Sequence, residues 1–121
     1  MRARKLGGDT SGAFVLLPDP MGATGGSLSR TIELYKSEGL PPARKIISLH
    51  LIITPEFIKR LRADHPEAVC YAIRLDRGMS SAAVLASGLG QSIDAESGLN
   101  EIQYIVPGAG GLGEILNNSF V

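Results

Sequence analysis

The sequence predicts an α/β fold in which helices flank a parallel sheet, and three observations support this fold class. Short apolar runs suited to strands occur at 13–17, 45–53 and 69–75. Helical patterns follow the first two runs, and a loop of small residues separates the first run from its helix. Because strands that alternate with helices form parallel sheets, we expect ligands to bind beyond the carboxyl ends of the strands.

The first part of the chain predicts one strand and one helix. The apolar run 13–17 predicts a buried strand. Ser27 has the side chain of a helix N-cap, and a helix is expected over 28–37, ended by Gly39. One face of this helix carries the apolar residues Leu28, Ile32 and Tyr35.

The later part of the chain predicts three more strands and a second helix. Pro41-Pro42 forces a turn, and the β-branched run 45–53 that follows predicts a central strand. Thr54-Pro55 predicts the start of the next helix, since proline is favoured at the first helical position. The run 69–75 predicts another strand, and 104–106 predicts a short one.

The most informative stretch is the loop between the first strand and the first helix, residues 19–27, which we call the small-residue loop. Little side-chain bulk stands between its backbone amides and a ligand, and two hydroxyls add further donors. A loop of this kind at a helix N-terminus is suited to a phosphate. The residues that form this cradle are Ala23, Thr24, Gly25, Gly26 and Ser27.

Asp19 precedes the cradle and suggests what else the loop binds. Its carboxylate would repel a phosphate, so it is free to accept from sugar hydroxyls or to attract a cation. An aspartate beside a phosphate cradle therefore indicates a ribose 5-phosphate. The alternative is a glycine-rich turn capped by Ser27, with no ligand.

Three islands of sequence, in the same order along the chain, resemble the uracil phosphoribosyltransferases. The small-residue loop differs at Gly22 alone from the family's Asp-Pro-Met-Leu-Ala-Thr-Gly-Gly-Ser. The stretch 54–58, Thr-Pro-Glu-Phe-Ile, is similar to the family's Ala-Pro-Glu-Gly-Ile, and 64–66 to its Ala-His-Pro turn. The third island comprises Leu99-Asn100-Glu101 and Tyr104-Ile105-Val106-Pro107-Gly108.

The resemblance implies a type I phosphoribosyltransferase fold, which is Rossmann-like, with 1–121 forming one domain that corresponds to the C-terminal half of the family fold. Members of the family are transferases that join uracil to the phosphoribosyl group of phosphoribosyl diphosphate, which releases pyrophosphate and yields UMP. Mg²⁺ accompanies the diphosphate substrate. The resemblance assigns no catalytic residue and no metal ligand here.

The resemblance also implies two groups of binding residues. Phosphoribosyl diphosphate would contact Asp19, Pro20, Met21, Gly22, Ala23, Thr24, Gly25, Gly26 and Ser27. Main-chain groups would read the edge of uracil, whose donors and acceptors alternate. The residues that would bind uracil are Tyr104, Ile105, Gly110, Gly111 and Leu112.

Gly111 replaces an aspartate that, in the family pattern, faces the diphosphate and its metal. This departure leaves three hypotheses open: a transferase that is part of a longer or complemented protein, a non-catalytic module that binds phosphoribosyl groups or nucleotides, and a structural fragment that needs a partner chain. Because a half-sheet leaves open edges, we expect a homo-oligomer.

Residues 77–98 form a segment where the family pattern has only a short connection. Small residues and glycines predict an inserted surface loop with one helical turn near 82–86. The insert is either a lid or subunit contact, or an insertion tolerated at little cost in stability.

Composition limits the classes of protein that remain. A hydrophobic content of 44% and a net charge of zero give no electrostatic case for binding nucleic acid or a membrane. No targeting or spanning segment is visible, and the single Cys70 suggests a buried thiol in a reducing cytoplasm. His50 and His65 lack partners at ligand spacing, so we expect a core or interface histidine and a turn residue, respectively.

Overall fold

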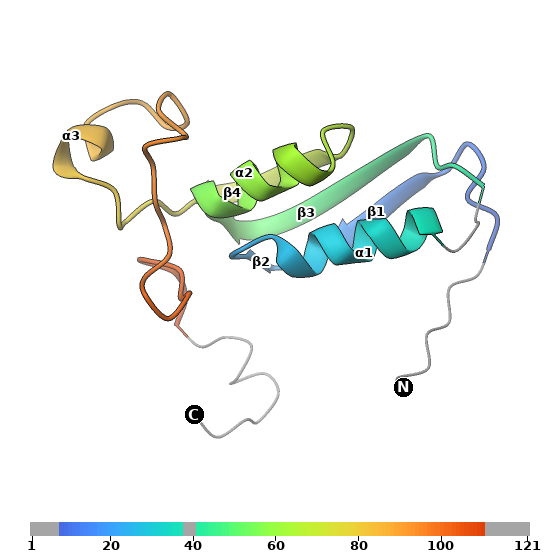
Figure 1. Cartoon of the computed structure of the whole chain (residues 1–121), viewed down its shortest axis with the longest axis horizontal. Coiled ribbons are helices and arrows are strands. Elements are labelled where there is room, and N and C mark those ends of the chain that lie inside the picture. Colours follow the sequence, from blue (N-terminus) through green and yellow to red (C-terminus); the bar gives the residue numbers. More distant parts are fainter. Residues whose placement is uncertain (1–7, 38–40, 111–121) are drawn as a thin grey trace, which may run out of the picture.

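The computed structural model describes residues 8–37 and 41–110. Along the chain lie β1 (Phe14–Pro18), β2 (Met21–Gly22), α1 (Gly26–Ser37), β3 (Lys45–Ile53), α2 (Pro55–Asp64), β4 (Val69–Leu75) and α3 (Ala82–Leu85). Every strand pairing in the sheet is parallel, and β3 is the central strand (Figure 1). The predicted fold class is therefore confirmed.

One edge of the sheet is interrupted where the small-residue loop begins. β1 pairs with the first half of β3, from Lys45 to Leu49, and β2 pairs with its last two residues. β4 pairs with β3 over 47–53. Between β1 and β2, the carbonyl of Pro20 accepts from the amides of Leu51 and Ile52, both at 3.1 Å. The chain thus leaves the sheet at 19–20 and pairs with β3 again at β2. The small-residue loop therefore starts beside the carboxyl end of β3.

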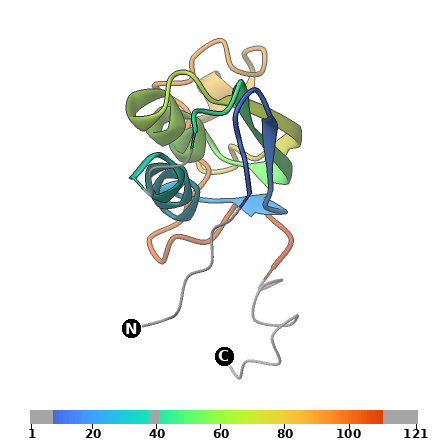
Figure 2. The ribbon, with the colours of Figure 1, turned by 90° about the vertical axis from the view of Figure 1, so that its right-hand side faces the viewer.

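Both long helices lie on the same face of the sheet, as Figure 2 shows. The core between them and the sheet consists of Leu28, Ile32, Ile53, Phe57 and Leu61. His50 faces this core from β3, with its side chain 5% exposed and its ring 4.6 Å from that of Phe57, centroid to centroid. Burial lowers its pKa, partly offset by Asp19, which favours a neutral core histidine as expected.

The opposite face of the sheet carries large apolar side chains that remain exposed, and we call it the open sheet face. The register places these side chains on one side, because Leu16 pairs with Ile47 and Leu49 with Tyr71. Exposure reaches 81% at Ile73. The members of the open sheet face are Phe14, Leu16, Leu49, Leu51, Tyr71 and Ile73.

A polar network at the end of α2 fixes α1 against α2. Ser29 donates to Asp64 at 2.6 Å, and its carbonyl lies 3.0 Å from Nε2 of His65. Nδ1 of His65 lies 3.1 Å from the ammonium group of Lys36, which can only donate, so the ring proton sits on Nε2 and points at Ser29. The predicted turn histidine is therefore also a buried link between the two helices.

Two predicted details of the elements are wrong. α1 begins at Gly26, and its first helical bond runs from the amide of Ser29 to the carbonyl of Gly25, so Ser27 lies within the first turn and is not the N-cap. Residues 104–106 form no strand, because Asn100 Oδ1 accepts from the amide of Tyr104 and bends the chain into a hairpin with one antiparallel bridge, Leu99 to Ile105. Gly39 lies outside the described residues.

The first strand begins one residue later than predicted, at Phe14, and it is not buried as expected, because Phe14 and Leu16 belong to the open sheet face. The other predicted elements agree with the structure. The central strand and β4 have the predicted bounds, and Thr54 is the N-cap of α2 with Pro55 at its start. The helical turn expected near 82–86 is α3. Cys70 lies in β4, where burial raises its pKa, partly offset by Ser48, as befits an unreactive thiol. Among the helices of the described ranges, none has the length and hydropathy needed to span a bilayer.

Candidate functional site

The small-residue loop lines an open cavity at the carboxyl end of the sheet. The cavity has a volume of about 490 Å³ and lies between the end of β1, the start of α1 and the ring of Phe57. It is bounded by eight of the nine predicted residues of the loop, with Gly26 as the exception. The structure therefore gathers the predicted phosphoribosyl diphosphate residues around one hollow.

The backbone of the loop is arranged to receive an anion. Gly25 has a φ of +77°, a conformation that favours glycine, and it turns the chain into α1. Within the described residues, no acceptor lies opposite the amides of Ala23, Thr24 and Ser27. Because such amides at a helix N-terminus carry partial positive charge, they suit a phosphate.

Asp19 sits at the entrance of the loop with part of its carboxylate engaged. Oδ1 accepts from the amide of Met21 at 3.2 Å, which forms a local turn. No bond to Oδ2 is present among the residues that the structure describes, so this oxygen can accept from a sugar hydroxyl. The role of Asp19 beside a ribose stays a prediction.

Thr54 supports the loop from below, a role that the sequence did not suggest. Its hydroxyl donates to the carbonyl of Ala23 at 2.6 Å and accepts from the amide of Phe57 at 3.1 Å, while its own amide donates to the carbonyl of Gly22. The side chain is fully buried. One residue therefore caps α2 and also fixes the middle of the loop.

Gly22 and Phe57 occupy a shared space beneath the loop. A Cβ atom at Gly22 would lie 2.7 Å from the ring of Phe57, which is fully buried and lines the cavity. The chain departs from the family pattern at both positions. The family has leucine where this chain has Gly22, and glycine where this chain has Phe57. The two departures thus compensate each other in volume.

Two residues of the second predicted group, Tyr104 and Ile105, lie on a hairpin over 98–108, which we call the base hairpin, and Gly110 follows it. Tyr104 and Ile105 are half-buried, and Gly110 is exposed. The hairpin lies beyond the carboxyl ends of β3 and β4, at the end of the sheet where β2 and the small-residue loop are found (Figure 1). Gly111 and Leu112 lie outside the described residues.

The described residues do not form a resident metal centre. No group of three or more His, Cys, Asp or Glu side chains within 8–37 and 41–110 could hold an ion. Asp19 is the only carboxylate of the small-residue loop, and one of its oxygens is already engaged. Among the described residues, this donor set does not fit a Mg²⁺ ion held by the protein alone.

A parallel sheet with a glycine-rich loop between the carboxyl end of a strand and a helix N-terminus is the arrangement found in α/β proteins that bind phosphorylated ligands. The family model "Uracil phosphoribosyltransferase" matches residues 2–95. The chain belongs to the uracil phosphoribosyltransferase family. The matched residues include the small-residue loop and end before the base hairpin.

Individual relatives agree with this assignment. The chain is 40% identical over 90 residues to a uracil phosphoribosyltransferase of Chlamydia muridarum, a match that covers 74% of this chain and 29% of the relative. It is 38% identical over 90 residues to one of Caldanaerobacter subterraneus subsp. tengcongensis, covering 74% and 41%. The chain thus spans less than half the length of these relatives.

A solved structure is similar to most of the described fold. The AQ2163 protein from Aquifex aeolicus superposes with a TM-score of 0.64 and 28% sequence identity. The superposition covers 90% of this chain and 41% of that one. More than half of the Aquifex aeolicus chain therefore has no counterpart here.

Proposed function

We propose that this chain contributes the phosphoribosyl-binding part of an enzyme that transfers a phosphoribosyl group to uracil. The observation that supports this proposal most directly is the small-residue loop, whose free amides line a cavity at the N-terminus of α1. The amides of Ala23, Thr24 and Ser27 would bind the 5-phosphate, and Asp19 would accept from the ribose. UMP and pyrophosphate would be the products, in the cytoplasm.

Uracil would bind at the base hairpin, according to the resemblance of 99–108 to the family pattern. Main-chain groups near Tyr104, Ile105 and Gly110, with Gly111 and Leu112 beyond the described residues, would read its edge. In the transfer, N1 of uracil forms a bond to C1 of the ribose as the bond from C1 to pyrophosphate breaks, and the proton of N1 passes to the departing pyrophosphate or to solvent. Such a step depends on the positioning of both substrates and on the electrostatics around the leaving group. Mg²⁺, bound to the diphosphate, would help to neutralise that group.

The test is calorimetric titration of the purified chain with phosphoribosyl diphosphate in the presence of Mg²⁺. We expect binding by the parent and a clear loss of affinity in Thr24→Ala, because one hydroxyl donor of the cradle is removed. Ser37→Ala is the matched control, since this exposed serine lies at the far end of α1. No binding by the parent, or equal affinity in both variants, would contradict the proposal.

A non-catalytic module that binds phosphoribosyl groups or nucleotides is the second candidate. The observation that favours it is Gly111, which stands where the family pattern has an aspartate facing the diphosphate. Such a module would bind ribose 5-phosphate and UMP without forming product. Gly111→Asp, made in the longest natural form of the protein, should raise UMP formation if the lost carboxylate is the only defect.

We also propose that the chain works in an assembly, either as a homo-oligomer or with a complementary chain. The support is the open sheet face, where six large apolar side chains remain exposed on a sheet whose strands are all parallel. Parallel sheets are normally covered on both faces. A second layer against this face would complete the arrangement.

A further inference from the structure

We propose that Asp76 and Glu56 are positioning residues that hold the two ends of the base hairpin at the carboxyl end of the sheet. The geometry of the two anchors is independent of any ligand, whereas the name of the hairpin rests on the proposed function. Asp76 directly follows β4, Glu56 lies in α2, and each carboxylate accepts from a backbone amide of the hairpin.

Asp76 holds the far end of the hairpin. Its side chain is only 3% exposed, and Oδ2 accepts from the amide of Gly108 at 2.8 Å. Both carboxylate oxygens also accept from the guanidinium of Arg74, with Oδ2 at 2.9 Å from Nη2. Its own amide donates to the carbonyl of Ile53, which fixes the aspartate to the end of β3. The hairpin is thereby joined to the sheet through one buried, charge-assisted bond.

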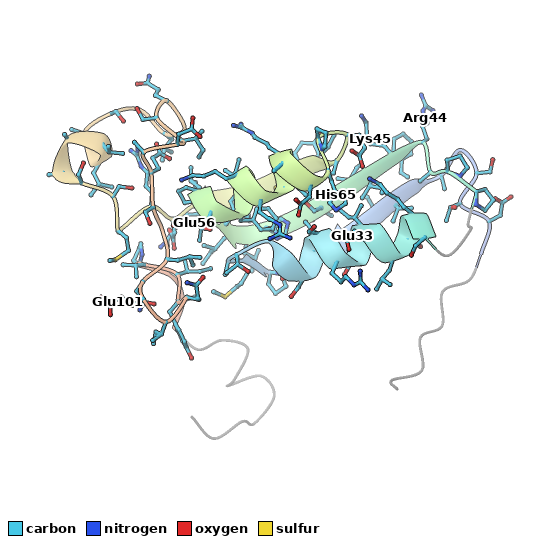
Figure 3. All side chains as sticks on the ribbon, in the orientation of Figure 1. Glu33, Arg44, Lys45, Glu56, His65 and Glu101 are labelled. Atoms are coloured by element: carbon cyan, nitrogen blue, oxygen red, sulfur yellow. The ribbon has the colours of Figure 1, made fainter. Side chains whose placement is uncertain are left out.

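Glu56 holds the near end of the hairpin. Oε1 accepts from the hydroxyl of Ser97 at 2.6 Å, and both carboxylate oxygens lie 3.1 Å from the amide of Gly98. Figure 3 shows Glu56 at the start of α2, the end of the helix nearest this segment. A carboxylate in the first turn is also favoured by the helix dipole, so Glu56 suits this place even before the hairpin docks.

Close backbone contacts reinforce the two anchors. A Cβ atom at Gly78 would lie 2.6 Å from the carbonyl oxygen of Val106, and one at Gly98 would clash with the carbonyl of Asp76. The amide of Gly78 donates to Val106, and the amide of Val106 donates to Gly98, both at 2.8 Å. The hairpin is therefore pressed against the end of β4 at positions where only glycine fits.

The insert 77–98 has bonds of its own, centred on Arg77, in addition to those that its last two residues make to Glu56. The guanidinium of Arg77 donates to the carbonyls of Val84, Leu85 and Ser87, and to the buried carboxylate of Glu96 at 2.9 Å. The two ends of the insert lie beside the anchors, because Asp76 directly precedes the insert and Glu56 binds the last two residues of the insert. The anchors thus keep the hairpin in place despite the long insertion.

The first turn of α2 emerges as the common support of both halves of the site. Thr54 binds the carbonyl of Ala23 in the small-residue loop, and Glu56, two residues later, binds the amide of Gly98 in the hairpin. A transfer between two bound substrates requires a fixed distance between their sites. By holding the hairpin in place, Glu56 and Asp76 fix where the hairpin lies relative to the small-residue loop.

The test is amide hydrogen exchange in the whole chain, comparing the parent with Glu56→Gln and Asp76→Asn. Loss of a charged acceptor should speed exchange at Gly98, Val106 and Gly108 by about 10-fold or more, with the loop 23–28 unchanged. Glu101→Gln is the matched control, because it removes an exposed carboxylate of the same hairpin. Unchanged exchange in the hairpin, or an equal rise throughout the sheet, would overturn the proposal.

A second readout separates this inference from the proposed function. Titration with uracil should show weaker binding in Glu56→Gln and Asp76→Asn, whereas the affinity for phosphoribosyl diphosphate stays at the parent value. If exchange rises in the hairpin but the parent binds no uracil, the anchors are confirmed and the proposed function fails. If both ligands weaken equally in the variants, a specific role in placing the hairpin is excluded.

Discussion

Gly22 and Phe57 show how a departure from a family pattern acquires a structural explanation. Considered alone, each residue is an unexplained departure from a motif that otherwise matches the family pattern. In the structure, the ring of Phe57 fills the space that a side chain at position 22 would need. Since protein interiors are closely packed, a large residue at one position requires a small one at the other.

Exchanging the two sizes tests this compensation. Gly22→Leu alone should destabilise the chain by about 1–3 kcal/mol through overpacking, and Phe57→Gly alone by about 3–5 kcal/mol through loss of a buried ring. The double variant should recover a substantial part, which gives a favourable coupling of about 1–3 kcal/mol in urea unfolding. Strictly additive losses would show that the two residues do not share one space.

Residue-scale predictions from the sequence were correct where side-chain chemistry alone decided them. Buried His50 followed from its place in an apolar run, whereas Cys70, predicted to be buried, is half-buried. Asp76 and Glu56 could not be recognised, because the amides that they bind lie 32 and 42 residues away along the chain. No local pattern encodes such a contact.

At the scale of elements, the first turn of α2 carries more than a helix start. The pattern Thr54-Pro55 predicted the start of the helix correctly. What it did not predict is that the same hydroxyl donates to the carbonyl of Ala23. The start of α2 was thus found from sequence, whereas the capping by Thr54 and its support of the small-residue loop became visible only in three dimensions.

Thr54→Val should remove both bonds of this hydroxyl while keeping the shape of the side chain. We expect a loss of about 1–2 kcal/mol in the free energy of unfolding, and faster exchange in the small-residue loop. Thr54→Ser keeps the hydroxyl and serves as the control, with a smaller loss. Equal losses in the two variants would mean that the missing methyl group and general packing matter more than the hydrogen bonds.

Glu56 should make the stability of the chain depend on pH. Burial alone would raise the pKa of this carboxyl, but hydrogen bonds from the Ser97 hydroxyl and nearby amides outweigh it and lower the pKa. Because the pKa is lower in the folded state than in the unfolded chain, the stabilisation is present above the unfolded pKa, about 4.3 for a glutamate, and is lost as pH falls through the folded pKa.

Urea unfolding of the parent and of Glu56→Gln at several pH values measures this effect. At pH 7 the parent should be more stable by about 1.5 kcal/mol, and the difference should shrink once the pH falls below about 4. Glu33→Gln, on the exposed face of α1, should show little such dependence. A difference that is constant down to strongly acid pH would contradict the account.

The order of elements was largely predictable, and the failures have a common cause. β3 and β4 stand out as apolar runs, and alternation with helices defines a parallel sheet. The run 104–106 has the composition of a strand but makes only a single antiparallel bridge, because Asn100 turns the segment back on itself. Strand formation depends on partners that composition does not specify.

At the scale of the whole molecule, the feature that needs an explanation is the open sheet face. Six large apolar side chains on one face exceed what a monomer normally exposes. The relatives are more than twice as long as the part that matches, so the family fold contains material beyond this chain. Sequence patterns alone did not reveal that the exposed side chains would all fall on one face.

We expect the isolated chain to self-associate through this face. Replacing Leu16 and Ile73 together by polar residues should shift the chain toward monomer in sedimentation experiments, without lowering its unfolding midpoint, because both side chains are already exposed. Leu28→Gln is the contrasting variant, since it should unfold the core. A parent chain that is monomeric at all accessible concentrations would argue against a role for this face in assembly.

The most direct test of the central claim is an NMR titration of the chain with ribose 5-phosphate, observing backbone amides. If the small-residue loop is the phosphoribosyl site, the amides of 23–28 should shift first and furthest, while those of β4 and the insert stay in place. Shifts that arise elsewhere, or none in the loop at saturating ligand, would show that the cradle at the N-terminus of α1 does not bind the phosphoribosyl group.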